Sequence, residues 1–212
     1  MNTTVIPAET ATPHVHAGSR LLRWLPLAGA AFAALSIAGD LVVGKFPDEN
    51  TPLARLTSYY AAHHAQVGHG GQLMELAAIF VALFGVALAS RVRTADPLAA
   101  AVIGIGAATA CLADAYEGAT FQFLGENATD VQLSPQALQA WHVSAAAFGT
   151  SVPILLLVLG MALAGRALPA WLVWSAVLLA VAQFTPFGFL AGMLMLLWFL
   201  VAGVALTLRP AR

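Results

Sequence analysis

The sequence predicts an all-α fold, a polytopic membrane bundle of six transmembrane helices with both termini in the cytoplasm. Of the 212 residues, 60% are hydrophobic and only 9% are charged, whereas about a quarter of the residues of a soluble protein carry charge. The apolar residues form several blocks long enough to cross the hydrocarbon core of a bilayer. Basic residues border these blocks in a pattern that fits an even number of crossings.

The chain begins with a segment that lacks the composition of a folded domain. Residues 1–19 are rich in Thr, Pro, Ala and His, so we expect a disordered tail followed by a single transmembrane domain over residues 20–212. The first apolar block is longer than the core of a signal peptide and contains Asp40, which favours a helix that is retained.

Six segments have the length of a membrane-spanning helix, which is about 20 residues at 1.5 Å per residue. Proline and glycine separate the last two segments and predict a sharp reversal between them. Pro153 is expected to kink the fourth. The six segments cover about residues 21–44, 72–90, 97–117, 138–165, 168–184 and 187–208.

A shorter helix is expected between the first two segments. Thr51 and Pro52 are a typical start, with threonine as the N-cap and proline in the first turn. Apolar residues then recur at helical spacing, which predicts an amphipathic helix over about 52–67 on the outer membrane surface.

The basic residues set the expected orientation. Lys45 and Arg55 fall on one side of the predicted membrane, and the other seven of the nine basic residues fall on the opposite side. Because positive residues gather in cytoplasmic loops, this pattern predicts cytoplasmic termini. The Ala-rich composition is typical of bacteria, so we expect a multi-pass protein of a bacterial inner membrane. The seven residues are Arg20, Arg23, Arg91, Arg93, Arg166, Arg209 and Arg212.

Composition also excludes several classes of function. The chain has no basic run that would attract nucleic acid. Its single cysteine, Cys111, excludes an intramolecular disulfide and a cysteine-based zinc motif. No nucleotide-binding or redox motif is present, so no cofactor is expected. The expected partners are the bilayer and a lipophilic small molecule, and protein partners are not indicated.

Carboxylates inside the predicted spans are the strongest functional signal, because each costs on the order of 3 kcal/mol to insert and membrane proteins keep such groups for function. The predicted topology brings them to one depth near the outer leaflet, together with His142 and Gln183. We therefore take five residues as catalytic candidates: Glu75, Asp114, Glu117, Asp40 and His142.

Two features of these candidates suggest acid–base chemistry. Asp114 and Glu117 are three residues apart and share a helix face, so two negative charges there would repel. Glu75 has only apolar neighbours along the chain. For Glu75 the alternative is a buried hydrogen bond that only joins two helices. For the Asp114–Glu117 pair the alternative is that Glu117 already lies in the water of the lipid headgroups.

Aromatic and amide side chains at the same depth are the substrate-binding candidates, namely Trp141, Tyr116, Phe121, Gln183 and Tyr60. Aromatic faces stabilise nearby positive charge. The candidates for metal ligands are His63, His64 and His69. Their spacing matches neither HExxH nor the paired ExxH motif. The alternative is that they are solvent-exposed residues of a loop.

The whole chain resembles the small multi-pass membrane proteins of high-GC bacteria, a resemblance that implies no activity. The chain also resembles the integral-membrane terpene cyclases in its plan, which is a small helical bundle with acidic residues near helix ends. In this sequence those acidic residues are Glu75, Asp114 and Glu117. That resemblance implies carboxyl groups that protonate an isoprenoid epoxide or olefin.

Three functions follow as expectations. The first is a cyclase or isomerase that uses carboxylates for acid–base chemistry on a lipophilic, isoprenoid-like substrate. The second is a carrier or sensor for a cation, proton or small molecule. The third is a structural or accessory membrane subunit in which the polar residues only join helices.

Overall fold

The computed structural model describes residues 23–48, 50–129, 134–147 and 151–209. These residues form α-helices and one short 3₁₀ turn, with no strand among them, which confirms the predicted all-α fold. The predicted disordered tail, residues 1–19, lies outside the described residues. The helices are α2 (Leu27–Val43), α3 (Leu53–Val92), α4 (Pro97–Asn127), α5 (Pro135–Ala147), α6 (Ser151–Leu163), α7 (Ala170–Ala182) and α8 (Gly188–Leu208).

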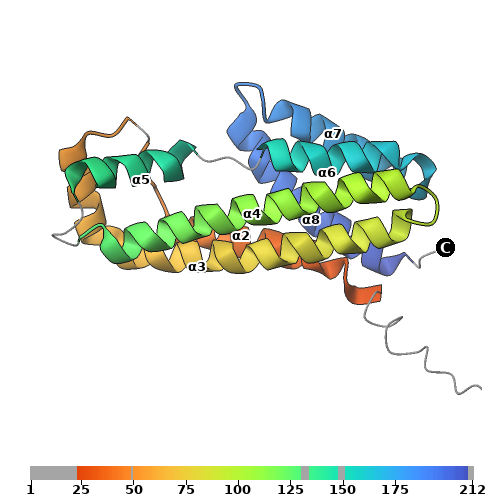
Figure 1. Ribbon diagram of the computed structural model, residues 1–212, viewed down its shortest axis with the longest axis horizontal. Helices are drawn as coiled ribbons and strands as arrows, with labels where there is room; N and C mark the ends of the chain where they lie inside the picture. The colour runs from red at the N-terminus through yellow and green to blue at the C-terminus, as the bar shows by residue number, and fades with distance from the viewer. Residues whose placement is uncertain (1–22, 49, 130–133, 148–150, 210–212) are drawn as a thin grey trace, which may run out of the picture.

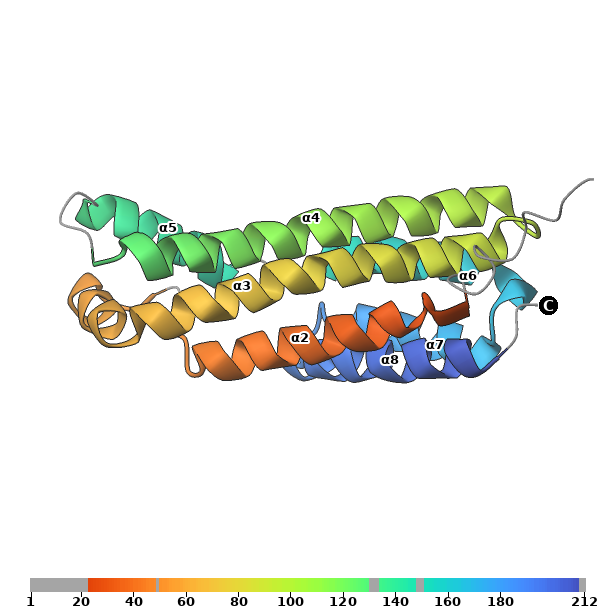
Figure 2. The same cartoon turned by 90° about the horizontal axis from the view of Figure 1, so that it is seen from below.

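The helices form an elongated bundle built around the long pair α3 and α4, which lie side by side along most of their length (Figure 1). Helix α2 lies along the part of α3 nearest its C-terminus, and α8 packs against α2 (Figure 2). Helices α6 and α7 cover α4 and α8 at the same end. At the other end α5 lies beside α4 and α3. We call this part the extension, and it comprises residues 53–67 of α3, residues 118–127 of α4, and α5.

Three helices are long and apolar enough to cross a membrane, judged by length and composition: α3, α4 and α8. Helices α2 and α7 and residues 152–163 of α6 are apolar but shorter. At 1.5 Å per residue, the 13 residues of α7 extend only about 20 Å.

The predicted surface helix 52–67 and the predicted span 72–90 are one continuous 40-residue helix, α3, so their separation is wrong. The glycines near the expected boundary are sites of close helix packing. A Cβ on Gly71 would lie 2.5 Å from the Gly118 carbonyl oxygen of α4, and one on Gly125 would lie 2.4 Å from the Gly68 nitrogen. Glycine therefore lets the α3 and α4 backbones touch.

The predicted span 138–165 is divided between α5 and α6, and residues 148–150 between them lie outside the described residues. Pro153 falls in the first turn of α6. A helix tolerates proline there because the first N–H groups have no intrahelical acceptor. The proline therefore belongs to a helix start rather than to the predicted kink.

Helix α4 continues ten residues beyond the predicted span 97–117 and ends at Asn127. Side chains in this added part bond within the helix: the Thr120 hydroxyl donates to the Tyr116 carbonyl at 2.8 Å, and the Gln122 amide donates to Glu126 at 3.1 Å. Polar residues therefore form much of the part of α4 that belongs to the extension.

Two buried apolar clusters stabilise the molecule. The larger fills the bundle and includes edge-to-face aromatic contacts, with ring centroids 4.9 Å apart for Phe32 and Phe199 and 5.4 Å apart for Phe84 and Phe199. The smaller holds the extension together around Leu56, Tyr60 and Leu124. The candidate site lies where the bundle meets the extension.

Candidate functional site

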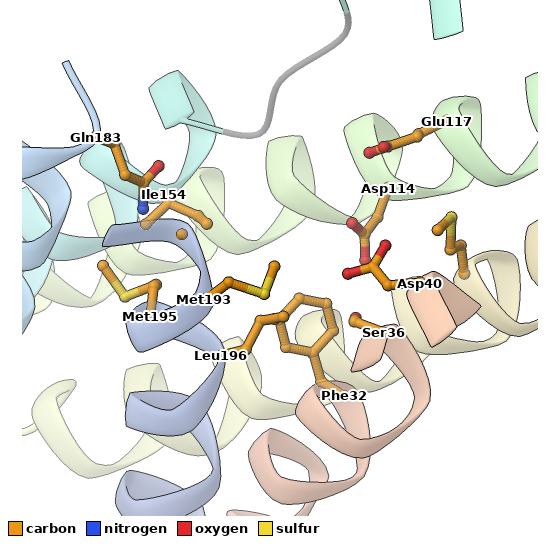
Figure 3. A pocket seen from close by; sticks show the side chains of 12 residues that line it. Phe32, Ser36, Asp40, Asp114, Glu117, Ile154, Gln183, Met193, Met195 and Leu196 are labelled. Atoms are coloured by element: carbon orange, nitrogen blue, oxygen red, sulfur yellow. The ribbon is translucent and has the colours of Figure 1, made fainter. Parts of the chain in front are cut away.

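A cavity of about 160 Å³ opens among the helices of the bundle (Figure 3). We call it the narrow compartment. It mixes acidic and amide groups with methionine and other apolar side chains. Its lining residues are Phe32, Ser36, Asp40, Met74, Asp114, Glu117, Ile154, Gln183, Gly192, Met193, Met195 and Leu196.

A second space of about 750 Å³, the wide compartment, is continuous with the first because Asp40, Met74, Glu117, Gln183 and Met193 are among the residues that line both. The residues that line only the wide compartment are mostly aromatic and aliphatic. They are Leu41, Val43, Gly44, Phe46, Phe121, Gly188 and Phe189.

Three carboxyl groups from two helices meet in the narrow compartment. Asp40 lies in the last turn of α2, and Asp114 and Glu117 lie one turn apart on α4. The carboxyl groups of Asp40 and Asp114 point toward one another, with Glu117 beside them (Figure 3). All three lie within electrostatic range of one another. Asp40 is exposed at the opening, whereas Asp114 and Glu117 are partly buried.

No Lys, Arg or His is among the residues that line either compartment. Three negative charges in a space partly removed from water repel one another strongly, and no basic side chain among the lining residues offsets them. The arrangement therefore favours sharing of protons among the carboxyl groups or binding of a group that satisfies them.

Three buried polar atoms in this cavity have no hydrogen-bond partner among the described residues: Oγ of Ser36, Oδ2 of Asp114 and Nε2 of Gln183. Only one further such atom, the Tyr59 hydroxyl oxygen, is found in the described part of the chain. Burial of an unpaired polar group costs about 1–3 kcal/mol. Water or a bound polar group in the cavity would satisfy these three atoms.

Helical spacing explains how these side chains reach the cavity. Phe32, Ser36 and Asp40 are four residues apart along α2, so they lie on one face. Gln183 caps the end of α7 and its backbone N–H bonds the Leu179 carbonyl. The chain then turns into α8, and a Cβ at Gly188 would lie 2.5 Å from the Gln183 carbonyl oxygen. Glycine at that position lets the turn hold Gln183 over the cavity.

The structure thus brings together five of the sequence-predicted residues. Asp40, Asp114, Glu117 and Gln183 line the narrow compartment, and Phe121 lines the wide one. Their convergence supports the expectation that side chains from separate helices share one hollow. Their catalytic and substrate-binding roles stay predictions.

His142 and Tyr60 lie elsewhere, buried in the extension. The His142 Nε2–H donates to the Asp48 carbonyl at 2.8 Å, and Nδ1 accepts from the Tyr60 hydroxyl at 3.1 Å. Both ring nitrogens are therefore occupied within the protein. A histidine held in this way joins α5 to α3 and to the loop before α3, and it does not face the carboxyl groups.

Glu75, Trp141 and Tyr116 also lie outside both compartments. Glu75 packs against α4, since a Cβ on Gly118 would lie 2.8 Å from the Glu75 Cγ. Trp141 contacts Phe123 with ring centroids 4.5 Å apart, and the Tyr116 hydroxyl lies 2.9 Å from Oγ of Ser144. These side chains join α4 to its neighbours rather than line the cavity.

The three histidines of α3 do not converge. The His63 Nδ1–H donates to the Tyr59 carbonyl at 2.9 Å and its ring stacks on the Tyr59 ring. His64 and His69 are exposed. Within the described residues, no group of three or more His, Cys, Asp or Glu side chains is arranged to hold a metal ion.

Several lining residues are not among the candidates taken from the sequence, including Ser36, Met74, Met193, Phe46 and Phe189. Ser36 could have been found, because it precedes Asp40 by one helical turn. The methionines and phenylalanines carry no comparable signal, because apolar residues are found on every face of a membrane helix.

Comparison of the chain with protein-family models, with curated proteins and with solved structures found no match.

Proposed function

We propose that the protein is a membrane-embedded enzyme, a cyclase or isomerase that uses carboxyl groups for acid–base chemistry on a lipophilic, isoprenoid-like substrate. The observation that carries this proposal is the convergence of Asp40, Asp114 and Glu117 on a cavity continuous with a larger apolar compartment. The polar part of the site holds protons, and the apolar part accommodates a hydrocarbon body.

The proposed chemistry needs two carboxyl groups in different protonation states. One carboxylic acid donates its proton to an olefinic carbon, and a neighbouring carboxylate removes a proton from the resulting cation. The substrate is rearranged, the enzyme regains its protons, and no oxidant or cofactor is consumed. Asp40 and Glu117 suit this exchange because both line the two compartments.

The wide compartment supplies the surroundings that a cationic intermediate requires. Phe46, Phe121 and Phe189 line it, and aromatic faces stabilise positive charge. Leu41 is 77% exposed and Phe189 is 83% exposed, on the ends of α2 and α8 that border this compartment. In a bilayer such side chains face lipid, so a substrate dissolved in the membrane would enter between them.

The membrane arrangement that we propose has six crossings, by α2, α3, α4, α6, α7 and α8, with both termini in the cytoplasm. The basic residues support it, because Arg91, Arg93 and Arg166 lie at the bundle end opposite the extension. The extension and the cavity mouth then face the periplasmic side of a bacterial inner membrane.

The two other functions considered fit the cavity less well. Polar residues that only join helices are expected to bond across them, yet the buried polar atoms of Ser36, Asp114 and Gln183 lack partners among the described residues. A carrier needs polar groups along a path across the membrane. Phe32, which lines the narrow compartment, instead belongs to the buried apolar cluster that also contains Phe199.

Deuterium incorporation tests the proposal without knowledge of the substrate. Purified protein in lipid nanodiscs is incubated in D₂O with lipids extracted from cells that naturally produce it, and the lipids are analysed by mass spectrometry. An acid that exchanges with solvent delivers deuterium to the substrate, so we expect one lipophilic species to gain deuterium.

Matched variants complete this test. Glu117→Gln should abolish the incorporation, whereas Glu126→Gln should preserve it, because Glu126 is an exposed carboxylate on the same helix and bonds only Gln122 among the described residues. Equal deuterium incorporation with wild type and with Glu117→Gln, or none with wild type, would overturn the proposed function.

A further inference from the structure

The loop that joins α2 to α3 contributes an aromatic wall to the wide compartment. It begins at Gly44, which ends α2 with a positive φ of 68°, and both Gly44 and Phe46 line the compartment. The Phe46 ring contacts the ring of Phe121, with centroids 4.8 Å apart. Because Phe121 also lines the compartment, the position of this loop determines the aromatic surface that a substrate would meet.

His142 of α5 contacts this loop in two ways. Its Nε2–H donates to the Asp48 carbonyl at 2.8 Å, across 94 residues of sequence. Its ring also packs on the Phe46 ring, with centroids 5.1 Å apart and planes inclined by 30°. His142 therefore holds both the backbone at the end of the loop and the side chain that lines the compartment.

The other hydrogen bonds of the loop are local. Among the described residues, the Gly44 N–H donates to the Asp40 carbonyl, and Asp48 accepts from Asn50 and Thr51. Such bonds shape the ends of the loop without fixing it against the extension. Ring contacts tolerate several relative positions, whereas a hydrogen bond weakens steeply with distance and angle. The bond from His142 is thus the contact that specifies where the loop lies.

We propose that His142 is a positioning residue, which by bonding the Asp48 carbonyl holds Phe46 in place as a wall of the wide compartment. This inference rests on the proposed function, because it gives His142 a part in placing the substrate of that same site. His142 is not among the residues that line either compartment. It therefore acts through Phe46 and not on the substrate itself.

Two substitutions separate this role from the stability of the extension. In His142→Gln the side-chain nitrogen reaches as far from Cβ as Nε2 does, so the bond to Asp48 is kept and the bond to Tyr60 is lost. In His142→Asn the shorter amide keeps an acceptor for the Tyr60 hydroxyl and cannot reach Asp48. Each variant loses one buried hydrogen bond, so both should lower the midpoint of thermal unfolding alike.

Photolabelling in lipid nanodiscs measures how well the compartment holds a hydrocarbon. The probe is phytane, a saturated isoprenoid hydrocarbon, carrying a diazirine. The measurement is the labelling of Met74, which is buried and lines both compartments. A Cβ at Gly192 meets no atom within 4 Å, and Gly192 also lines both compartments, so Gly192→Phe should fill the space and define the background.

We expect His142→Gln to retain the labelling of the wild type and His142→Asn to reduce it about tenfold, the effect of losing roughly one aromatic contact. Phe46→Ala removes the wall directly and should reduce the labelling equally. If His142 acts through Phe46, the double variant should lose no more than either single variant.

Unchanged labelling in His142→Asn, equal losses in the Gln and Asn variants, or a further tenfold loss in the double variant would overturn the positioning role. The labelled wild type would then still support the cavity on which the proposed function depends. No labelling of the wild type above Gly192→Phe would refute that cavity, and the inference with it.

Discussion

The Tyr60 hydroxyl and Nδ1 of His142 lie 3.1 Å apart in the buried centre of the extension, joining α3 to α5 across 82 residues of sequence. The other ring nitrogen of His142 donates to the Asp48 carbonyl at 2.8 Å. Because a carbonyl only accepts, Nε2 carries the hydrogen, and Nδ1 of the neutral ring accepts from Tyr60. Phe46 covers the histidine, with ring centroids 5.1 Å apart. One buried histidine thus joins three segments.

Tyr60→Phe should destabilise the extension. The substitution removes the hydroxyl and leaves Nδ1 of a fully buried histidine unpaired, which costs about 1–3 kcal/mol. Faster proteolysis within α5 and a lower midpoint of thermal unfolding in detergent would report the loss.

The adjacent tyrosine is the control. The Tyr59 hydroxyl is buried without a partner among the described residues, so Tyr59→Phe removes an unsatisfied group and should leave stability unchanged or raise it. Equal destabilisation by the two substitutions would mean that the hydrogen bond to His142 contributes nothing.

Gly71→Ala should separate α3 from α4. The added Cβ would lie 2.5 Å from the Gly118 carbonyl oxygen and 2.6 Å from the Gln122 nitrogen. Backbone atoms cannot move aside as a flexible side chain would, so the helices must shift apart. We expect a loss of about 1–3 kcal/mol in unfolding free energy, measured by steric trapping or by unfolding in mixed micelles.

For Gly104→Ala on α4 we expect no loss of unfolding free energy. No atom lies within 4 Å of its Cβ, so only helix propensity changes, and alanine is favoured by up to about 1 kcal/mol. A stabilising effect at Gly71, or a large loss at Gly104, would contradict the packing described for these helices.

The helical class and the convergence of Asp40, Asp114, Glu117 and Gln183 follow from the sequence, because charged and amide groups stand out against an apolar background. The continuity of α3 through Gly68 and Gly71 does not, since glycine serves both at helix ends and at helix contacts, and only the neighbouring backbone distinguishes the two.

The position of Glu75 could not be predicted for a related reason. It is one turn from Gly71 on α3, but it packs beside Gly118 of α4 and not toward the cavity. Depth in the membrane follows from sequence, whereas the rotation of a helix about its axis depends on packing against all its neighbours. His142 was likewise assigned to the wrong group of residues, since it bonds Tyr60 and the Asp48 carbonyl rather than the cavity carboxyl groups.

Arg91→Ala should loosen the end of α8. The Arg91 guanidinium, near the end of α3, donates from Nη2 to the Leu206 carbonyl at 2.7 Å. The last four carbonyls of a helix lack intrahelical donors, and positive charge at that end is also favoured by the helix dipole. We expect a loss of about 1–3 kcal/mol, with faster hydrogen exchange in the last turn of α8.

Arg93→Ala is the matched control, because Arg93 is exposed just beyond the end of α3. Removal of its charge should change stability little. If hydrogen exchange in α8 responds to Arg93→Ala as much as to Arg91→Ala, general charge rather than the bond to Leu206 stabilises this end.

The proposed topology places the two ends of α4 on opposite sides of the membrane. In a Cys111→Ala background, Arg93→Cys and Glu126→Cys each introduce one exposed thiol, before the start of α4 and in its last turn. A membrane-impermeant maleimide added to intact spheroplasts should label Glu126→Cys at once and Arg93→Cys only after permeabilisation.

Labelling of both from outside would refute this arrangement, because α4 would then not cross the membrane. The same result would place the bundle end that carries Arg91 and Arg166 in the periplasm, against the preference of basic residues for the cytoplasm. Since the cavity opens toward the Glu126 end of α4, the experiment also decides from which side of the bilayer a ligand could reach the carboxyl groups.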